Sequence, residues 1–396
     1  MTNSQKNMLQ ILKSICQYGA VSIKVLSNLS QMSIPSITQY VEKMTQDGIL
    51  NEQIPDTSST GRPPKLYNLN PKYGYFISID MGLIGSIYYG IFNFEGKLLV
   101  KNDLSYKADG DGEHIIDSII TRIKETLILS NFPTEKLLCI VIGNPGVVDR
   151  DTGAITNMSA APAIWANIPL KLVFEKEFGV NTIVMNDINL SAIGEKEYGM
   201  GKGYSNFFFI RNDVGLKCGI IIKDRLYQGD TLAAGEIGQN VIITKFGDSQ
   251  NPFEIKSAES LLSLDSIYAA IIEELDDNQE DTFFSMVNGD PKLVHIDIIL
   301  KVLGTKSFVG DIVEQRGKLF GYVLLNMVTT LDISLIIVSG DIIRLNNYYF
   351  KPARDLLSQY LQNPPTILIS SLGNSVALVG GYAVGLEYIF DSRLCN

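Results

Sequence analysis

Hydrophobic positions recur at helical spacing near the start of the chain and again between residues 34 and 44. The first set is Met8, Leu9, Ile11, Leu12 and Ile15, before a glycine at position 19 that ends the predicted helix. A second helix is predicted from about Ser22 to Ser30. In the third, the predicted buried stripe is Ile34, Ile37, Val41 and Met44. With Ser33 as N-cap and Pro35 in the first turn, the pattern predicts a helix-turn-helix.

Two short strand-like segments follow, at 48–52 and 66–69, with polar residues between them. They predict a β-hairpin with a long tip, which would make the head a winged helix-turn-helix. We expect Arg62 in that tip to enter a minor groove. The outer face of the third helix offers four side chains to base edges or phosphates in a major groove: Ser36, Gln39, Tyr40 and Lys43. Alternatively, such a head is a protein-interaction module, and Lys43 and Arg62 are solvated charges.

The rest of the chain reads as an α/β body. An apolar strand at 183–185 ends at Asn186-Asp187, and small residues then open a helix, which is where doubly wound folds place ligand chemistry. A carboxylate can accept a hydrogen bond from a hydroxyl and an amide can donate and accept, so the pair suits a sugar. The alternative is that Asn186 only caps the helix and Asp187 favours its dipole. Trp165 is expected either in a pocket wall or in the core.

Longer helices are predicted in the second half of the body. Their ranges are 257–274, 311–331 and 375–390, and residues 276–290 are predicted to be a polar connection.

Four motifs occur in a recognisable order and spacing. They are Asp80-Met81-Gly82, Gly143-Asn144-Pro145-Gly146, Asn186-Asp187 and Gly235-Glu236-Ile237-Gly238-Gln239. From about Tyr75 to the C-terminus this arrangement resembles the ROK family of repressors, open reading frames and sugar kinases. The resemblance implies a winged helix-turn-helix over 1–72 and a two-lobed, actin-like and ribonuclease H-like domain over 73–396. Lobe one would comprise about 76–185 with 375–396, and lobe two about 186–374.

The resemblance also assigns a sugar site. It implies that Asn186, Asp187, Glu236 and Gln239 bind sugar hydroxyls, with Gln239 standing where the family has a histidine. Glu254 matches a further sugar-binding glutamate, although the shortened loop before it leaves that alignment open. The family's cysteine-rich zinc loop is replaced by residues 245–252, which contain no cysteine, so no metal is expected.

The nucleotide-binding elements of the family are altered. Leu83 and Ile84 replace the small or hydroxylated residues of the first phosphate loop, and Asp213 brings a carboxylate into the second. At 339–341, Ser-Gly-Asp replaces consecutive glycines. We therefore expect ATP binding to be lost, Asp187 to be a vestigial base, and no cofactor to be needed.

Composition refines this picture. The 396 residues are 45% hydrophobic and carry a net charge of −10. Residues 1–75 hold seven basic and four acidic side chains, a net +3, so the remainder is at −13. A basic head can approach DNA while an acidic body is repelled. No run of 18 apolar residues and no signal peptide is found, so we expect a cytoplasmic protein that does not enter a membrane.

The sequence favours a sugar-responsive regulator, most simply a repressor. A sugar or sugar phosphate would close the cleft between the lobes and change the spacing of two recognition helices in a homodimer or homotetramer on a palindromic DNA operator. One alternative is an active ATP-dependent sugar kinase with a regulatory head. Another is an interaction scaffold with neither activity.

Overall fold

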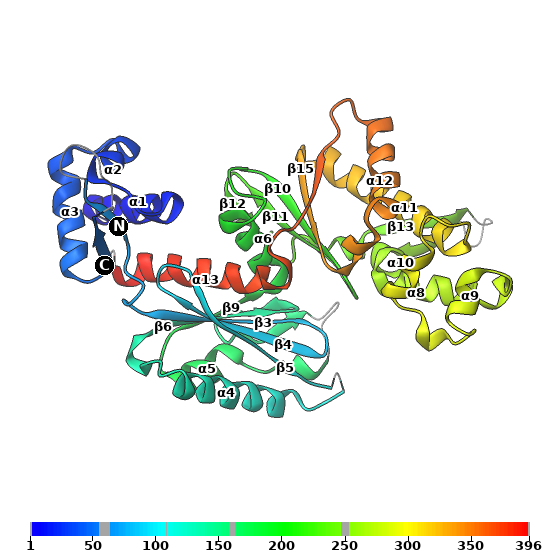
Figure 1. The fold of residues 1–396 in the computed structure, drawn as a ribbon, viewed down its shortest axis with the longest axis horizontal. Coiled ribbons are helices and arrows are strands. Elements are labelled where there is room, and N and C mark those ends of the chain that lie inside the picture. The colour runs from blue at the N-terminus through cyan, green and yellow to red at the C-terminus, as the bar shows by residue number, and fades with distance from the viewer. Residues whose placement is uncertain (1, 55–63, 108, 158–162, 247–252, 395–396) are drawn as a thin grey trace. The chain divides into compact units, whose positions relative to one another are not determined.

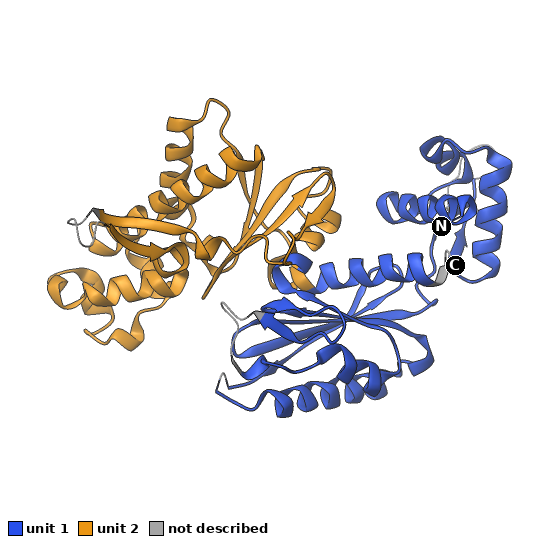
Figure 2. Ribbon diagram, turned by 180° about the vertical axis from the view of Figure 1, so that it is seen from behind, with its two compact units in different colours: residues 1–190, 378–396 blue, residues 191–377 orange. Residues whose placement is uncertain are grey.

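The computed structural model describes residues 2–54, 64–107, 109–157, 163–246 and 253–394 (Figure 1). The chain forms two compact units, coloured separately in Figure 2. Unit 1 comprises residues 1–190 and 378–396, and unit 2 comprises residues 191–377.

Unit 1 begins with a small helical head. Its elements are α1 (Asn3–Tyr18), α2 (Ile23–Ser30), α3 (Ile34–Gln46), β1 (Leu50–Gln53) and β2 (Leu66–Leu69). Side-chain oxygens of Thr2, Ser22 and Ser33 cap the three helices. The strands β1 and β2 pair antiparallel, and Val21 forms a further bridge to Tyr67. The predicted helix-turn-helix and wing strands are therefore present, and Arg62 lies outside the described residues.

One residue of the predicted stripe on α3 does not belong to the core. Ile37, Val41 and Met44 are fully buried, whereas Ile34 is 53% exposed. Ile34 is the first residue of α3, directly after the N-cap Ser33. At that end the neighbouring turn that would cover its side chain is missing, so helical spacing alone overestimates its burial.

The rest of unit 1 is built on a five-stranded sheet in the order β5-β4-β3-β6-β9. The strands are β3 (Tyr75–Leu83), β4 (Ser86–Asn93), β5 (Leu98–Ser105), β6 (Leu137–Asn144) and β9 (Thr182–Asn186). β3, β6 and β9 run parallel, and the hairpin β3-β4-β5 is antiparallel. A short ribbon of β7 (Val147–Val148) and β8 (Ile155–Asn157) follows β6. The carboxyl ends of β6 and β9 are thus adjacent.

Helices cover both faces of this sheet (Figure 1). One face packs on α4 (Gly112–Leu129) and α5 (Leu170–Phe178), where Ile140 and Ile142 join a common apolar cluster with both helices. The other face packs on α13 (Val376–Ile389). A Cβ on Gly381 would lie 2.1 Å from Ser78 Oγ, so α13 approaches β3 more closely than a larger residue allows.

Unit 2 repeats the strand order of unit 1, as β12-β11-β10-β15-β16. Its strands are β10 (Phe207–Asn212), β11 (Leu216–Ile222), β12 (Arg225–Tyr227), β15 (Leu335–Ser339) and β16 (Thr366–Ile369), and a separate hairpin pairs β13 (Val241–Phe246) with β14 (Phe253–Ser257). The helices are α7 (Ala258–Leu262), α8 (Leu264–Glu273), α9 (Thr282–Met286), α10 (Ile296–Val302), α11 (Phe308–Leu331) and α12 (Asn346–Tyr360). The helix α6 (Asp187–Tyr198) begins in unit 1 and ends in unit 2.

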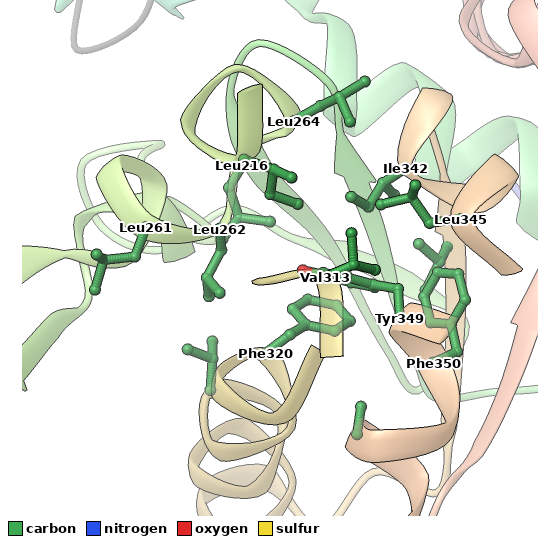
Figure 3. Close-up of a cluster of buried hydrophobic side chains, with 14 of the residues drawn as sticks. Leu216, Leu261, Leu262, Leu264, Val313, Phe320, Ile342, Leu345, Tyr349 and Phe350 are labelled. Carbon is green, nitrogen blue, oxygen red and sulfur yellow. The ribbon is translucent and has the colours of Figure 1, made fainter. Parts of the chain in front are cut away.

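Aromatic side chains from α11 and α12 occupy the core of unit 2 (Figure 3). The ring centroids of Phe320 and Tyr349 lie 5.4 Å apart, and those of Tyr349 and Phe350 lie 5.3 Å apart. Leucines of β11, α7 and α8 pack in the same cluster. Because Tyr349 is fully enclosed, burial raises the pKa of its phenol.

Two predictions for this region were wrong. The single helix predicted over 257–274 is two helices, because the Ser263 side chain accepts a hydrogen bond from the N–H of Ser266 and starts α8 as a new helix. The predicted polar connection over 276–290 contains α9, which Asp281 caps by accepting from the N–H of Phe283. In both places a cap residue within a polar or mixed stretch begins a helix.

Candidate functional site

The Asn186-Asp187 pair lies where β9 ends and α6 begins. Asn186 is paired in register with Asn144 at the end of β6. Its Oδ1 accepts a hydrogen bond from the N–H of Ile188 at 3.0 Å, and its Nδ2 donates to the carbonyl of Gly146 at 3.2 Å. Asn186 therefore does cap α6, and it also ties α6 to the loop after β6.

Asp187 is 1% exposed and lies against the backbone of β3. A Cβ on Gly82 would lie 2.0 Å from Asp187 Oδ2, so only glycine at 82 leaves the carboxylate in place. The N–H of Gly82 in turn donates to Asp80 Oδ1 at 2.9 Å. The sheet thus brings two of the predicted motifs, Asp80-Met81-Gly82 and Asn186-Asp187, into contact. An acid and an amide held side by side in this way suit a polyhydroxylated ligand.

Trp165 belongs to the core. It is 1% exposed, and its ring meets that of Tyr106 edge to face with centroids 5.3 Å apart. Burial raises the pKa of the Tyr106 phenol. Of the two interpretations of Trp165, core packing therefore describes its position.

The remaining sugar-site candidates lie in unit 2. Glu236 and Gln239 belong to one short turn, in which Glu236 is half-buried and Gln239 exposed. Gly235 precedes them at φ +96°, and a Cβ there would lie 1.8 Å from the carbonyl oxygen of Cys218. Glu254 lies on β14 in an ion pair with Lys245 at 3.2 Å, and its side chain is 43% exposed.

The first nucleotide-loop candidate is occupied by a tight hairpin in unit 1. β3 continues through Leu83 with a register shift after Asp80, and only two residues, Ile84 and Gly85, separate it from β4. Gly85 adopts φ +81°, and Ile84 is 47% exposed. An apolar side chain at the tip offers no hydrogen bond to a phosphate oxygen.

The second and third nucleotide-loop candidates bind each other in unit 2. Asp213 Oδ2 accepts from Arg211 Nε at 2.8 Å, and its Oδ1 accepts from the N–H of Asp341 at 2.5 Å. Gly340 adopts φ +92°, and a Cβ there would meet the carbonyl oxygen of Asn212 at 2.3 Å. We call Arg211, Asp213 and the Asp341 N–H the Asp213 network. It engages a guanidinium and a backbone N–H, which are the groups that usually bind anions.

The four candidates for DNA contact on α3 differ in their surroundings. Gln39 and Lys43 are exposed and lie one helical turn apart on the same face. The Ser36 hydroxyl is 2.9 Å from the hydroxyl of the N-cap Ser33. The Tyr40 hydroxyl accepts from Asn7 Nδ2 at 3.3 Å, so this side chain reaches toward α1. Hydrogen bonds from Ser4 and Asn7 lower the pKa of Tyr40.

The described residues contain neither a metal site nor a membrane-spanning helix. There, no group of three or more His, Cys, Asp or Glu side chains is arranged to hold a metal ion. No helix in the same ranges is long and apolar enough to cross a membrane. Residues 247–252, in the segment that replaces the zinc loop, lie outside these ranges.

Comparison with known proteins identifies the family. The model of the ROK family matches residues 76–387, and the chain belongs to this family. The xylose repressor of Caldicellulosiruptor bescii is 24% identical over 355 residues, which cover 90% of this chain and 88% of that protein. The predicted α/β fold, a winged helix-turn-helix followed by a two-lobed ROK domain, is confirmed.

Two solved structures are similar along most of their length. A ROK family transcriptional regulator, described as a homologue of the Escherichia coli MLC protein, has a TM-score of 0.81 at 19% identity and covers 98% of this chain and 97% of its own. A ROK family glucokinase from Streptomyces griseus in complex with glucose and AMPPNP has a TM-score of 0.64 at 23% identity and covers 78% and 99%. The regulator therefore aligns with the head as well as the body of this chain. The share of this chain that aligns with the glucokinase, 78%, is close to the share that the body makes up.

Two features of these sites were missed by sequence reasoning. The sequence motifs include Asn144 without assigning it a role, although it stands beside Asn186 in the sheet. No predicted site includes Arg211, although it pairs with Asp213. Asn144 has a local signal in the sequence, because it is a polar residue at the end of the apolar run 137–143. Arg211 has no local signal beyond the i, i+2 charge pair that it makes with Asp213.

Proposed function

We propose that this protein is a sugar-responsive, DNA-binding transcriptional regulator, most simply a repressor of carbohydrate-utilisation genes. The observation that carries the proposal is that the winged head and the sheet bearing Asn186-Asp187 belong to one compact unit. Lys13 on α1 pairs with Glu387 on α13 at 3.0 Å, and Asn68 on β2 donates to Glu95 at 2.8 Å. These two contacts connect the head to the rest of unit 1, so a ligand bound at the sheet could influence DNA binding by the head through them.

The sugar is proposed to bind at Asn186 and Asp187 in unit 1, and at Glu236, Gln239 and Glu254 in unit 2. Support comes from the family motifs and from the buried acid-amide pair. Glu254 is the weakest member, because its side chain is 43% exposed and already pairs with Lys245. A sugar or sugar phosphate changes DNA affinity only if it favours one of two conformations of the regulator.

The head is proposed to read DNA with α3. Gln39 and Lys43 are the leading contacts because they are exposed, and Ser36, Tyr40 and Arg62 complete the proposed set. Two-fold symmetric regulators read half-sites about one helical turn apart, so we propose a homodimer or homotetramer on a palindromic operator.

ATP binding is proposed to be lost. In unit 2 the carboxylate of Asp213 accepts from the N–H of Asp341 and from Arg211, so these two donors are already occupied and an incoming polyphosphate would have to displace a carboxylate to reach them. In unit 1 the Leu83-Ile84-Gly85 turn presents apolar bulk. On this proposal Asp187 binds a hydroxyl and no longer serves as a catalytic base.

The test begins with selection of DNA sequences bound by the full-length protein from a random library. Operator affinity is then measured with D-xylose, D-glucose, other common sugars and their phosphates. At least one compound is expected to change the affinity. The proposal would be contradicted if the protein bound no DNA sequence in the library, or if no sugar or sugar phosphate changed its operator affinity.

Two variants and a kinase assay sharpen this test. Lys43→Ala is expected to weaken operator binding and to reduce its salt dependence by about one counterion. The matched control is Lys351→Ala, which removes an exposed lysine on α12 in unit 2. Incubation with ATP and the same sugars should yield no sugar phosphate; turnover would support the alternative, a working kinase with a regulatory head.

A further inference from the structure

Asn144 ends β6 with a buried side chain that has no hydrogen-bond partner in the described part of the chain. It is 0% exposed, and neither its Oδ1 nor its Nδ2 has a hydrogen-bond partner among the residues that the structure describes. Within those ranges it is the one side chain with two such atoms. Buried amides in native proteins are almost always hydrogen-bonded, so an amide with both ends unpaired points to a ligand.

The register of the sheet places Asn144 beside the proposed sugar site. Asn144 and Asn186 are partners in the parallel ladder, and neighbouring strands lie about 4.8 Å apart. The alternation of side chains puts both on the sheet face that carries Ile142 and Val184. On the opposite face of the sheet, a Cβ on Gly143 would lie 3.4 Å from Asp187 Cα, so the backbone of Asp187 comes close to β6 at the residue before Asn144.

The hydrogen-bonding capacity of the two asparagines differs. Asn186 already uses its Oδ1 to cap α6 and one N–H to bind Gly146. Asn144 retains two N–H donors and an acceptor oxygen, a set that a hydroxyl group complements because it also donates and accepts. Asn144, Asn186 and Asp187 are all at least nine-tenths buried, so a sugar that enters to reach Asp187 enters the same covered end of the sheet.

We propose that Asn144 is a further effector-binding residue that hydrogen-bonds one hydroxyl of the sugar and thereby sets which sugar is accepted. The proposal rests on the sugar-sensing function proposed above. Its physical basis is that the same buried amide lowers the stability of the sugar-free protein and makes sugar binding selective. The unpaired amide destabilises the sugar-free protein, and a bound sugar that lacks the matching hydroxyl leaves it unpaired.

The experiment uses the full-length protein and the substitution Asn144→Leu, which keeps the branching of the side chain at Cγ and removes both polar atoms. Without sugar, the thermal midpoint of the variant is expected to rise by about 2–4 °C. Affinity is measured by calorimetry with D-xylose and D-glucose, and then with monodeoxy analogues of whichever binds wild type more tightly. Asn144→Leu is expected to bind the parent sugar about tenfold more weakly. Wild type should bind each monodeoxy analogue more weakly than the parent sugar. Asn144→Leu should bind one of these analogues, the one that lacks the hydroxyl contacted by Asn144, as tightly as the parent sugar.

Thr182→Val is the matched control. Thr182 opens β9, is 1% exposed, and its Oγ1 has no partner among the described residues. Thr182 lies four residues before Asn186 on the same strand, so the two residues are about 13 Å apart along the strand. Thr182→Val should raise the thermal midpoint and leave sugar affinity and selectivity unchanged.

Unchanged affinity in Asn144→Leu, an equal loss for every analogue, or a lowered thermal midpoint would overturn the proposal for Asn144. If Asn144→Leu does not fold, Asn144→Ser should bind the parent sugar more tightly than Asn144→Ala, and equal binding would overturn it. Wild type that binds no sugar at all would instead sink the sugar-sensing function itself.

Discussion

The two units share one strand order and treat their polar groups in opposite ways. In unit 2, the turn after β10 and the end of β15 bind each other: the Asp213 carboxylate accepts from the Asp341 N–H and pairs with Arg211. In unit 1, β6 ends at Asn144, whose amide has no partner in the described ranges. The same topology thus carries, in unit 2, an end at which the Asp213 carboxylate is bound internally and, in unit 1, an end at which the Asn144 amide retains capacity for a ligand.

This difference separates stability from function. An internal network contributes to the free energy of unfolding whether or not a ligand is present. An unpaired buried amide lowers that free energy until a ligand binds. Removing the polar groups of the Asp213 network should therefore destabilise unit 2 and leave sugar binding intact, whereas removing Asn144 or the charge of Asp187 in unit 1 should impair sugar binding.

The largest effect is expected for Asp187→Asn. The side chain keeps its shape but loses the charge that accepts hydrogen bonds from sugar hydroxyls, so sugar affinity should fall about 10- to 100-fold. Calorimetry with the sugar that binds wild type measures this. The control is Asp151→Ala, an exposed acid of the same unit, which should bind as wild type does. Equal affinity of Asp187→Asn and wild type would remove Asp187 from the site.

Asp213→Ala should be the largest stability defect of the set. It removes two hydrogen bonds and leaves Arg211, whose side chain is only 11% exposed, without that partner, so the unfolding free energy should fall by about 2 kcal/mol. Urea unfolding is followed by circular dichroism and by fluorescence of Trp165, the single tryptophan, which lies in unit 1.

The matched control for that variant is Asp355→Ala. Its partner is Lys351 in an i, i+4 pair whose side chains are 70% and 60% exposed, so a change within about 0.5 kcal/mol is expected. Sugar affinity should be unchanged in both variants. An Asp213→Ala protein with a wild-type urea midpoint would show that the Asp213 network is not what stabilises this end of unit 2.

Gly82→Ala should lower sugar affinity about tenfold, because the new methyl group would lie 2.0 Å from Asp187 Oδ2 and displace the carboxylate from its hydrogen-bonding position. Calorimetry again measures the change. Gly310→Ala on α11 is the control, since a Cβ there meets nothing within 4 Å. That control should bind sugar normally; a Gly82→Ala protein that does the same would argue against Asp187 as a fixed contact.

The smallest effect is expected for Lys13→Ala. Lys13 and Glu387 are 55% and 61% exposed, so their ion pair should contribute at most about 0.5 kcal/mol to the unfolding free energy, and less at high salt. Thermal unfolding at low and high ionic strength checks this. A loss above about 1 kcal/mol would show that the pair, rather than apolar packing, holds the head on α13.

Local patterns predicted much of the fold. Ser33, Pro35 and the stripe at Ile37, Val41 and Met44 define α3, because caps and helical spacing depend on neighbours in sequence. The same logic placed the Asn186-Asp187 pair at the end of β9. It missed the break at Ser263, where a cap competes with a continuous apolar stripe.

Partners distant in sequence were beyond such reasoning. Asp213 and Asp341 are 128 residues apart, and nothing local to either indicates the hydrogen bond that joins them. Tyr40 has helical spacing suited to an outer face, yet its hydroxyl meets Asn7, 33 residues earlier. The spacing of a helix defines a face, whereas the packing of other helices decides what covers it.

The sequence by itself determined the winged head, the two α/β lobes, the charge contrast between head and body, and the motifs of the ROK family, since each depends on residue type and short-range order. Only the tertiary structure decided which polar ends of the two sheets are satisfied. That outcome depends on strand register, which sets Asn144 beside Asn186, and on loop packing, which brings the Asp341 N–H to Asp213.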